Sequence, residues 1–203
     1  MKYSALTSVS SLLVVVILHL AHGWDAPWFC HGYECPEFTV VNTYEDFEER
    51  EYKGCRWITS DSASDSDSDL KAAFTNLWDY TQGNNQAGGI LNAHTWPALV
   101  TTTEVRERRE KNVSVSFLVA TENVILPTPN ALIREETMPA STIYVRSFSS
   151  LSSRYTVQDN LDKLRNALAL AGKSFNTYQY TMAAYENPWT LIDRHDEVWI
   201  HAA

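Results

Sequence analysis

The sequence predicts an α+β fold, in which an antiparallel sheet or distorted β-barrel is flanked by two α-helices. Two segments carry the apolar spacing of a helix, and short alternating segments typical of strands stand before and after each of them. The order is therefore strands, helix, strands, and then the same again. We expect two pseudo-symmetric halves built on one plan, although the residues themselves do not repeat.

The first helix is expected at residues 69–82, and Gly83 would end it. Its apolar residues recur at helical spacing and are predicted to share one face: Leu70, Phe74, Leu77 and Trp78.

The second helix is expected at residues 157–171, ended by Gly172. Its predicted apolar face holds Val157, Leu161, Leu164 and Leu168. Thr156 and Asp159 would form a capping box at its start, and Asp159 would pair with Lys163 four residues later.

The strands follow from alternation of polar and apolar side chains. Residues 113–119 alternate most clearly, with Val113, Val115, Phe117 and Val119 on one buried face. Similar short strands are expected at residues 37–42, 47–52, 56–60, 141–148, 178–185 and 197–201.

The N-terminus predicts a cleavable secretion signal at residues 1–23. The predominantly apolar run 12–20 has nine residues. As a helix it would span about 14 Å, too short for a hydrocarbon layer of about 30 Å. The small residues Ala21 and Gly23 favour cleavage after Gly23, although a buried N-terminal helix is the alternative. We therefore expect a secreted, extracellular mature chain, residues 24–203, that forms a single domain.

The mature chain is acidic. Removing Lys2 from the 16 Lys and Arg residues leaves 15 basic against 25 acidic side chains, a net charge of −10. Nucleic acids and anionic membrane surfaces require clustered basic residues, so neither is expected as a partner.

The three cysteines suggest one local disulfide. Cys30 and Cys35 bracket four residues near the mature N-terminus, where a bridge would tie down the chain in an oxidising compartment. Metal ligation by these two cysteines with His31 is the alternative. Cys55 is left over, either buried as a small apolar side chain or joining two chains.

Residues 60–69 alternate Ser and Asp. Asp65, Asp67 and Asp69 occupy the first three ligand positions of a calcium-binding loop, but Leu70 and Asn76 stand where Gly and Glu are required. A solvated acidic loop before a helix N-terminus is the preferred interpretation. Residues 126–130 are expected to form a second, exposed loop.

No motif in the sequence nominates an enzyme: it has no nucleophile elbow, phosphate loop, dinucleotide fingerprint or zinc-protease motif. Glu48, Glu49 and Glu51 are the candidate catalytic carboxylates, but charged alternation on an exposed strand is the commoner explanation. On a strand, Glu49 and Glu51 share one face and Arg50 points the other way. Asn112 begins a glycosylation sequon immediately before an alternating strand.

Four segments together resemble the SOUL, or haem-binding-protein, family. The C-terminal tract 180–200 is similar to the family's closing tract, with its Tyr, Pro, Arg and Glu-Val-Trp residues in order. The other three matches are at residues 47–50, 74–85 and 142–148. The resemblance covers residues 35–200, and it implies a distorted antiparallel barrel of two halves with two helices.

The resemblance also implies tetrapyrrole binding on an apolar surface beside the first helix, where this chain has Lys71, Phe74 and Trp78. Some relatives are proposed to use an axial His in the second strand, at the position that Glu51 occupies here. His94 begins the segment that replaces the family's Met-Thr-x-Pro-Val pattern, and it is the remaining candidate ligand.

Two functions of different classes follow. The first is a secreted, non-enzymatic protein that binds haem or another tetrapyrrole in an apolar groove, without obligatory His ligation. The alternative is a cofactor-free module that binds a protein partner through the same scaffold. Hydrolysis by a carboxylate in the barrel groove is a third hypothesis, based on fold analogy alone.

Overall fold

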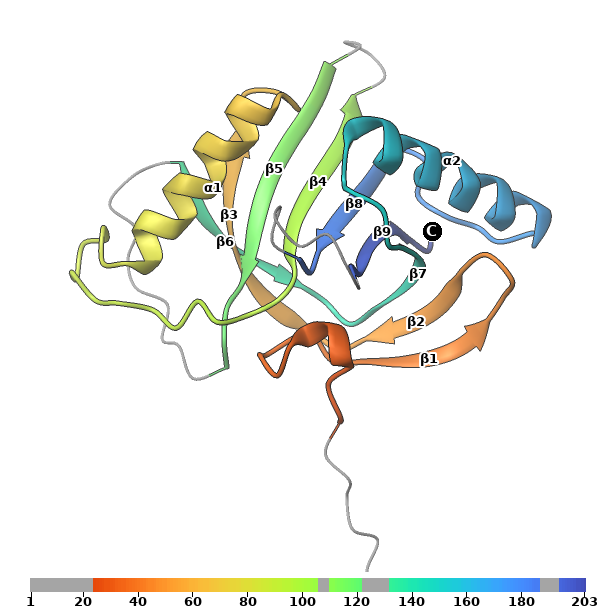
Figure 1. The fold of residues 1–203 in the computed structure, drawn as a ribbon, viewed down its shortest axis with the longest axis horizontal. Coiled ribbons are helices and arrows are strands. Elements are labelled where there is room, and N and C mark those ends of the chain that lie inside the picture. The colour runs from red at the N-terminus through yellow and green to blue at the C-terminus, as the bar shows by residue number, and fades with distance from the viewer. Residues whose placement is uncertain (1–23, 106–109, 122–131, 187–193) are drawn as a thin grey trace, which may run out of the picture.

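The computed structural model describes residues 24–105, 110–121, 132–186 and 194–203, which form one curled sheet flanked by two helices (Figure 1). A short 3-10 helix, η1, spans Trp28–Cys30. The two α-helices are α1 (Asp67–Thr81) and α2 (Arg154–Leu170). The strands are β1 (Phe38–Thr43), β2 (Glu48–Tyr52), β3 (Cys55–Ser62), β4 (Ala98–Val105), β5 (Glu110–Leu118), β6 (Ile133–Met138), β7 (Ser141–Phe148), β8 (Gln179–Ala184) and β9 (Asp196–His201). The predicted α+β fold is confirmed.

The sheet order reveals the two halves. It reads β1-β2-β7-β9-β8-β4-β5-β3-β6, and every pair of neighbours is antiparallel. β4 and β8 meet at the centre; moving outward, β5 matches β9, β3 matches β7, and β6 matches β2. Each half is thus two strands, a helix and two strands, as the sequence pattern predicted, and β1 is an addition at one edge.

The sheet curls around an interior core. One buried cluster contains Tyr52 of β2 and Trp57 of β3, although these strands lie six places apart in the sheet order. Leu99, Ile143 and Trp199 belong to the same cluster. Side chains from such distant strands can meet only if the sheet bends into a half-barrel with these residues on its inner face.

The helices cover the outer face, one on each half. Leu77 of α1 packs with Val115 of β5, and Leu164 of α2 packs with Val198 of β9. The remaining predicted apolar residues of the second helix behave as expected, with Leu161 and Leu168 buried and Val157 at the margin.

The start of α2 was predicted wrongly. The helix begins three residues earlier, because Ser153 is extended (φ −90°, ψ 161°) and its hydroxyl accepts the Thr156 backbone N–H at 3.1 Å. Thr156 is therefore inside the first turn and does not cap it. The expected ion pair between Lys163 and Asp159 is present at 2.7 Å.

Two strands were not predicted from the sequence. β4 is threonine-rich, and Thr101 and Thr103 point into the half-barrel where an apolar side chain would have marked the strand. β6 is an edge strand with four exposed polar residues in a row, so it carries little alternation. The proposed signal 1–23 and the loop 126–130 lie outside the described residues. Of the helices in the described residues, none has the length and apolar character needed to cross a membrane.

Candidate functional site

An apolar groove lies beside α1, between that helix and the segment that leads into β4. We call it the α1 groove; it has a volume of about 240 Å³. Its main lining residues are Tyr33, Phe74, Trp78, His94, Trp96 and Phe117. Three of the four residues proposed from the sequence therefore lie together: Phe74, Trp78 and His94.

The aromatic wall exists because of how α1 is rotated on the sheet. The helix buries Ala73, Leu77 and Tyr80, whereas Phe74 is 45% and Trp78 47% exposed. The expected single apolar face is thus wrong in detail, since Ala73 and Tyr80 complete the buried stripe and displace the two aromatic residues to its edge. Phe74 rests edge-on against Phe117 of β5, with ring centroids 4.8 Å apart.

The N-terminal segment forms the opposite wall, and a disulfide holds it in place. Cys30 and Cys35 are bonded, which confirms the predicted bridge and removes both thiols as metal ligands. Within this loop Glu34 pairs with Thr95 in a parallel bridge, and the Glu34 carbonyl accepts the Trp96 backbone N–H at 2.9 Å. This pairing brings the Tyr33 ring to 5.5 Å from the His94 ring.

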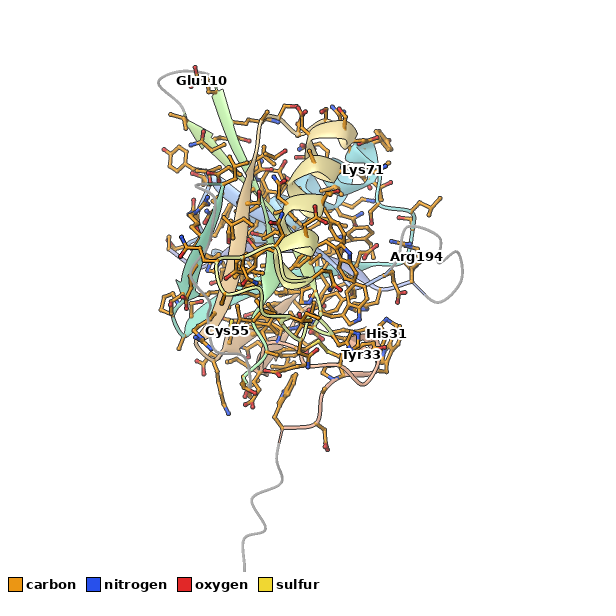
Figure 2. All side chains as sticks on the ribbon, turned by 90° about the vertical axis from the view of Figure 1, so that its left-hand side faces the viewer. His31, Tyr33, Cys55, Lys71, Glu110 and Arg194 are labelled. Atoms are coloured by element: carbon orange, nitrogen blue, oxygen red, sulfur yellow. A yellow bond between two sulfur atoms is a disulfide. The ribbon has the colours of Figure 1, made fainter. Side chains whose placement is uncertain are left out.

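Lys71 does not line the groove. It lies near the N-terminal end of α1, the end of the helix that is farther from Tyr33 (Figure 2). Its ammonium makes no ion pair with any residue in the described ranges. Among the same residues, the His94 ring nitrogens make no hydrogen bond, so one of them is free to coordinate a ligand.

Glu51 is remote from the groove. It lies exposed on β2, opposite Thr142 of β7, and β2 stands five places from β5 in the sheet order. A side chain at this position cannot reach a ligand that rests on Phe117. A site beside α1 and an axial ligand at residue 51 are therefore mutually exclusive in this fold.

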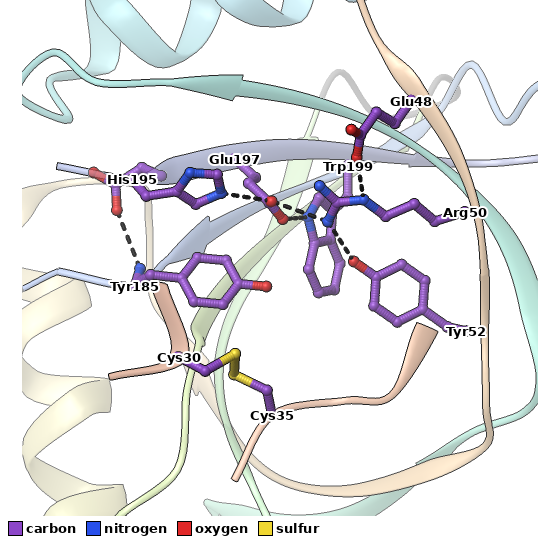
Figure 3. Close-up of polar contacts among 10 residues, drawn as sticks. Cys30, Cys35, Glu48, Arg50, Tyr52, Tyr185, His195, Glu197 and Trp199 are labelled. Carbon is purple, nitrogen blue, oxygen red and sulfur yellow. Dashed lines mark hydrogen bonds and ion pairs between the residues drawn. A yellow bond between two sulfur atoms is a disulfide. The ribbon is translucent and has the colours of Figure 1, made fainter. Parts of the chain in front are cut away.

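A buried polar network fills one end of the half-barrel (Figure 3). At its centre the Arg50 Nη1 atom lies 3.0 Å from the Glu197 carboxylate, with Arg50 4% and Glu197 0% exposed. His195 lies 2.7 Å from the same carboxylate oxygen, and the Trp199 indole donates to the other at 2.6 Å. Arg50 also donates to the Tyr52 hydroxyl at 3.1 Å.

The network is held in one charge state. Burial alone would raise the pKa of Glu197, but the charge of Arg50 and the contacts with His195 and Trp199 hold that pKa below its usual value. Burial and the nearby Glu197 charge raise the pKa of Tyr52. The carboxylate is thus ionised and the phenol neutral around pH 7, an arrangement that binds the strands together.

Two of the three candidate carboxylates of β2, Glu48 and Glu49, are paired with basic side chains. Glu48 accepts from Arg50 at 2.8 Å, and Glu49 forms an ion pair with Lys173 at 2.8 Å. Hydrogen bonds from Lys173 and Asn42 lower the pKa of Glu49. The predicted alternation is confirmed, with Glu49 and Glu51 on the outer face and Arg50 inside. The inward Arg50, however, serves the buried network and not a solvent-facing strand.

The acidic tract before α1 behaves as a helix start. Ser66 caps α1 by accepting the Asp69 backbone N–H at 3.2 Å, and Asp67 and Asp69 lie in the first turn. Asp65 instead lies near Lys111 and Arg154. Within the described part of the chain, no three His, Cys, Asp or Glu side chains gather as a metal site would require.

Two further sequence expectations need correction. Cys55 is free but only partly buried. It stands at the start of β3, where it pairs with Met138 of β6, whereas the pairing with β5 begins only at Trp57. Burial raises the pKa of its thiol to about 11. Asn112 does not precede its strand; it lies exposed within β5, paired with Thr103 of β4.

The comparison with known families settles the relationship. A family model described as SOUL heme-binding protein matches residues 33–201, most of the chain. The chain belongs to the SOUL heme-binding protein family. Curated relatives of this SOUL chain include heme-binding protein 2 of Mus musculus, 29% identical over 159 residues that cover 76% of this chain and 77% of that protein. Heme-binding protein 1 of Xenopus laevis is 26% identical over 159 residues, covering 75% and 82%.

Solved structures share the fold of this SOUL chain at low identity. The C-terminal domain of EcmrR superposes with a TM-score of 0.56 at 13% identity, covering 82% of this chain and 98% of that one. A hydrolase from Listeria innocua gives a TM-score of 0.55 at 7% identity, covering 80% and 94%. At such identity the likeness concerns the fold alone.

Proposed function

We propose that this SOUL protein binds haem or a closely related tetrapyrrole in the α1 groove, as a binding protein and not as an enzyme. One observation carries the proposal: Phe74 and Trp78 are half-exposed in a groove that also holds a free imidazole, His94. Exposed aromatic side chains gathered in one concave place mark a binding surface more often than chance exposure. Membership of the family supports the same ligand class.

The groove suits a flat aromatic ligand. Trp78 and Phe74 offer ring surface from the helix, and Trp96 offers it from the facing segment. Contacts between aromatic rings contribute about 0.5–1.5 kcal/mol each beyond the burial of apolar area. Three such contacts would contribute about 1.5–4.5 kcal/mol in addition to the apolar area that the ligand buries.

Two polar groups would orient the ligand. His94, on the segment before β4, could donate a ring nitrogen to the iron, which supplies a coordination bond that the stacking does not. Lys71, about two turns before Trp78 on α1, could meet a propionate as a point charge. Neither group is required for stacking, so binding without His ligation remains part of the proposal.

The size of the groove limits affinity. Its volume of about 240 Å³ falls below the range of roughly 300–1,000 Å³ that encloses most small ligands. A porphyrin would leave part of its surface in water. We therefore expect dissociation constants in the micromolar range, near −8 kcal/mol (roughly 1 µM), and not picomolar retention.

We further propose that the protein is secreted after cleavage behind Gly23. The apolar leader supports this, and so does the Cys30–Cys35 disulfide, because structural disulfides persist in oxidising compartments.

The test is a hemin titration of the purified secreted protein, followed by Soret absorbance and tryptophan quenching. Trp78→Ala should weaken binding by about tenfold, the equivalent of about 1.4 kcal/mol. His94→Ala should bind with a changed Soret position if the imidazole ligates the iron. Trp28→Ala is the matched control, because Trp28 is also exposed but does not line the groove.

Two results would contradict the proposal. If Trp28→Ala weakens binding as much as Trp78→Ala does, the ligand does not rest on α1. If the wild-type protein produces no Soret shift at all, the apolar groove is better explained as a contact for a protein partner.

A further inference from the structure

A second and larger cavity lies on the inner face of the half-barrel. We call it the concave cavity; it has a volume of about 910 Å³ and is bordered by β3, β4, β5, β6, β8 and β9. It is separate from the α1 groove because alternate residues of a strand point to opposite faces. On β5, Phe117 points to the groove beside α1, whereas Ser114 and Ser116 point to the cavity.

The walls of the concave cavity are unusually rich in hydroxyl groups. Thr101 of β4 and Thr181 of β8 face each other across the central strand pair, with their hydroxyl oxygens 3.0 Å apart. Ser116 is similarly paired with Thr59 at 2.8 Å. In the Thr101–Thr181 pair either hydroxyl can be the donor. In the other pair Ser116 donates, because the Thr59 hydroxyl donates to Glu136 at 3.0 Å. Among the described residues, Ser114 adds a hydroxyl that makes no side-chain hydrogen bond.

This hydroxyl-rich lining is found at one end of the half-barrel interior. The other end is filled by Ile143, Val145 and the charged network around Glu197. Hydroxyl groups turned inward are costly unless they are hydrogen-bonded, and the paired hydroxyls meet this need among themselves. Each oxygen still has unused acceptor capacity, which water or a polar ligand can fill. Trp57, Leu99 and Trp199 form an apolar floor beneath them.

The charges of the concave cavity balance. Arg134 bonds both acidic residues, Asp61 at 2.5 Å and Glu136 at 2.8 Å, and Lys111 is the second basic residue. Two acidic and two basic side chains leave no net charge to attract an anion or a cation. Burial lowers the pKa of His201, so this lining residue is a neutral imidazole that both donates and accepts.

We propose that the concave cavity binds a neutral, hydroxyl-rich small molecule of the saccharide class. Sugar hydroxyls both donate and accept hydrogen bonds, and the Thr101–Thr181 pair can reorient to match either need. The Ser116 and Thr59 oxygens keep lone pairs that can accept. The oxygens of Glu136 and the guanidinium of Arg134 would fix the ligand's orientation. The volume lies within the range of ordinary ligand pockets, and the apolar floor matches the C–H faces of a sugar ring.

The test uses full-length mature protein made in a bacterial periplasm, where disulfides form but Asn112 carries no glycan. The probes are glucose, galactose, mannose, N-acetylglucosamine and the β1,4-linked disaccharide of each. Saturation-transfer NMR should detect at least one of them with a millimolar or lower dissociation constant. Glucose 6-phosphate serves as a charged probe and should bind no more tightly than glucose.

A paired variant makes the test specific. Replacing both Thr101→Val and Thr181→Val removes the two hydroxyls together and leaves neither partner unpaired, so the fold should be retained. Sugar binding should fall by more than tenfold, while the near-ultraviolet circular dichroism is unchanged. Thr39→Val, on the exposed edge strand β1, is the control and should bind as the wild type does.

Three outcomes would overturn the proposal. They are no binding of any neutral probe at millimolar concentration, undiminished binding by the paired valine variant, and tighter binding of the phosphorylated sugar. Hemin should not displace a bound sugar, because the two sites lie on opposite faces of β5. Displacement would also overturn the assignment of sugars to a separate cavity.

Discussion

Removing Arg50 should destabilise the protein strongly and in a pH-dependent way. Arg50→Met leaves the Glu197 carboxylate fully buried without its cationic Arg50 partner, although its contacts with His195, Trp199 and Tyr185 remain. Breaking a buried pair by removing one partner costs about 3–5 kcal/mol. In a chain of this length, each kcal/mol lowers the melting temperature by about 2–4 °C, so a decrease of about 6–20 °C is expected.

The pH dependence gives this prediction its signature. In the wild type Arg50 keeps the folded-state pKa of Glu197 low, so the stability it contributes is present above the unfolded pKa and lost as pH falls through the folded value. Without Arg50, burial dominates and raises that folded-state pKa. The buried charge then costs stability at neutral pH, and the cost shrinks as protonation proceeds on acidification. The gap between variant and wild type should therefore narrow at acid pH.

The assay is thermal unfolding followed by circular dichroism between neutral and acid pH, with Arg134→Met as the matched control. Arg134 also pairs with two carboxylates, but its side chain is 43% exposed, and exposed pairs contribute about 0–1 kcal/mol. A loss in Arg50→Met no larger than in Arg134→Met would refute the reasoning. So would a large loss that does not change with pH.

Other predictions concern the thiol, the second helix, the sequon and the leader. Cys55 should react slowly with iodoacetamide at about pH 8 in the native protein and quickly after unfolding, because burial raises its thiol pKa to about 11. Finding Cys55 in a disulfide would contradict the prediction of a free thiol. Ser153→Ala should lower the free energy of unfolding in urea by about 1 kcal/mol through loss of the α2 cap, and more than Thr156→Val does. Protein from a eukaryotic secretory host should lose mass on glycosidase treatment through Asn112, and an unchanged mass would show the sequon unused. N-terminal sequencing of the secreted protein should begin at Trp24, and any other first residue would place the cleavage site elsewhere.

The architecture could be predicted because periodicity reports which side of an element is buried. The sequence of β5 alternates apolar and polar residues, and Val115 and Phe117 do lie in the cluster that contains Leu77 of α1. β4 was missed for the opposite reason: it presents hydroxyls to the concave cavity, so the inward positions that usually reveal a strand are polar. The feature that hid this strand is the one that suggests a second ligand site.

The candidate site was predictable only in part. Helical spacing brought Phe74 and Trp78 to one side of α1, but spacing alone could not say that they would lie at the edge of the buried stripe. Tyr33 and Trp96 were missed because they reach the groove through the bridge between Glu34 and Thr95, a contact across 61 positions (95 − 34) that leaves no local signal. Lys71 was placed in the same set by spacing, although its side chain does not line the groove.

The buried network shows the same limit. The sequence gives Arg50 and Glu197 as ordinary charged residues 147 positions apart. Their pairing follows from two inward positions on β2 and β9, which both flank β7. Only the sheet order, and not any motif, places these two charges together in the interior.

The most direct test of the α1 groove is to locate bound hemin by NMR. Paramagnetic iron broadens nearby resonances, and a complex with zinc protoporphyrin provides the diamagnetic reference. We predict that broadening centres on Tyr33, Phe74, Trp78 and His94, while residues of β2 around Glu51 keep their line widths. Broadening centred on β2, with the α1 resonances unchanged, would contradict the account.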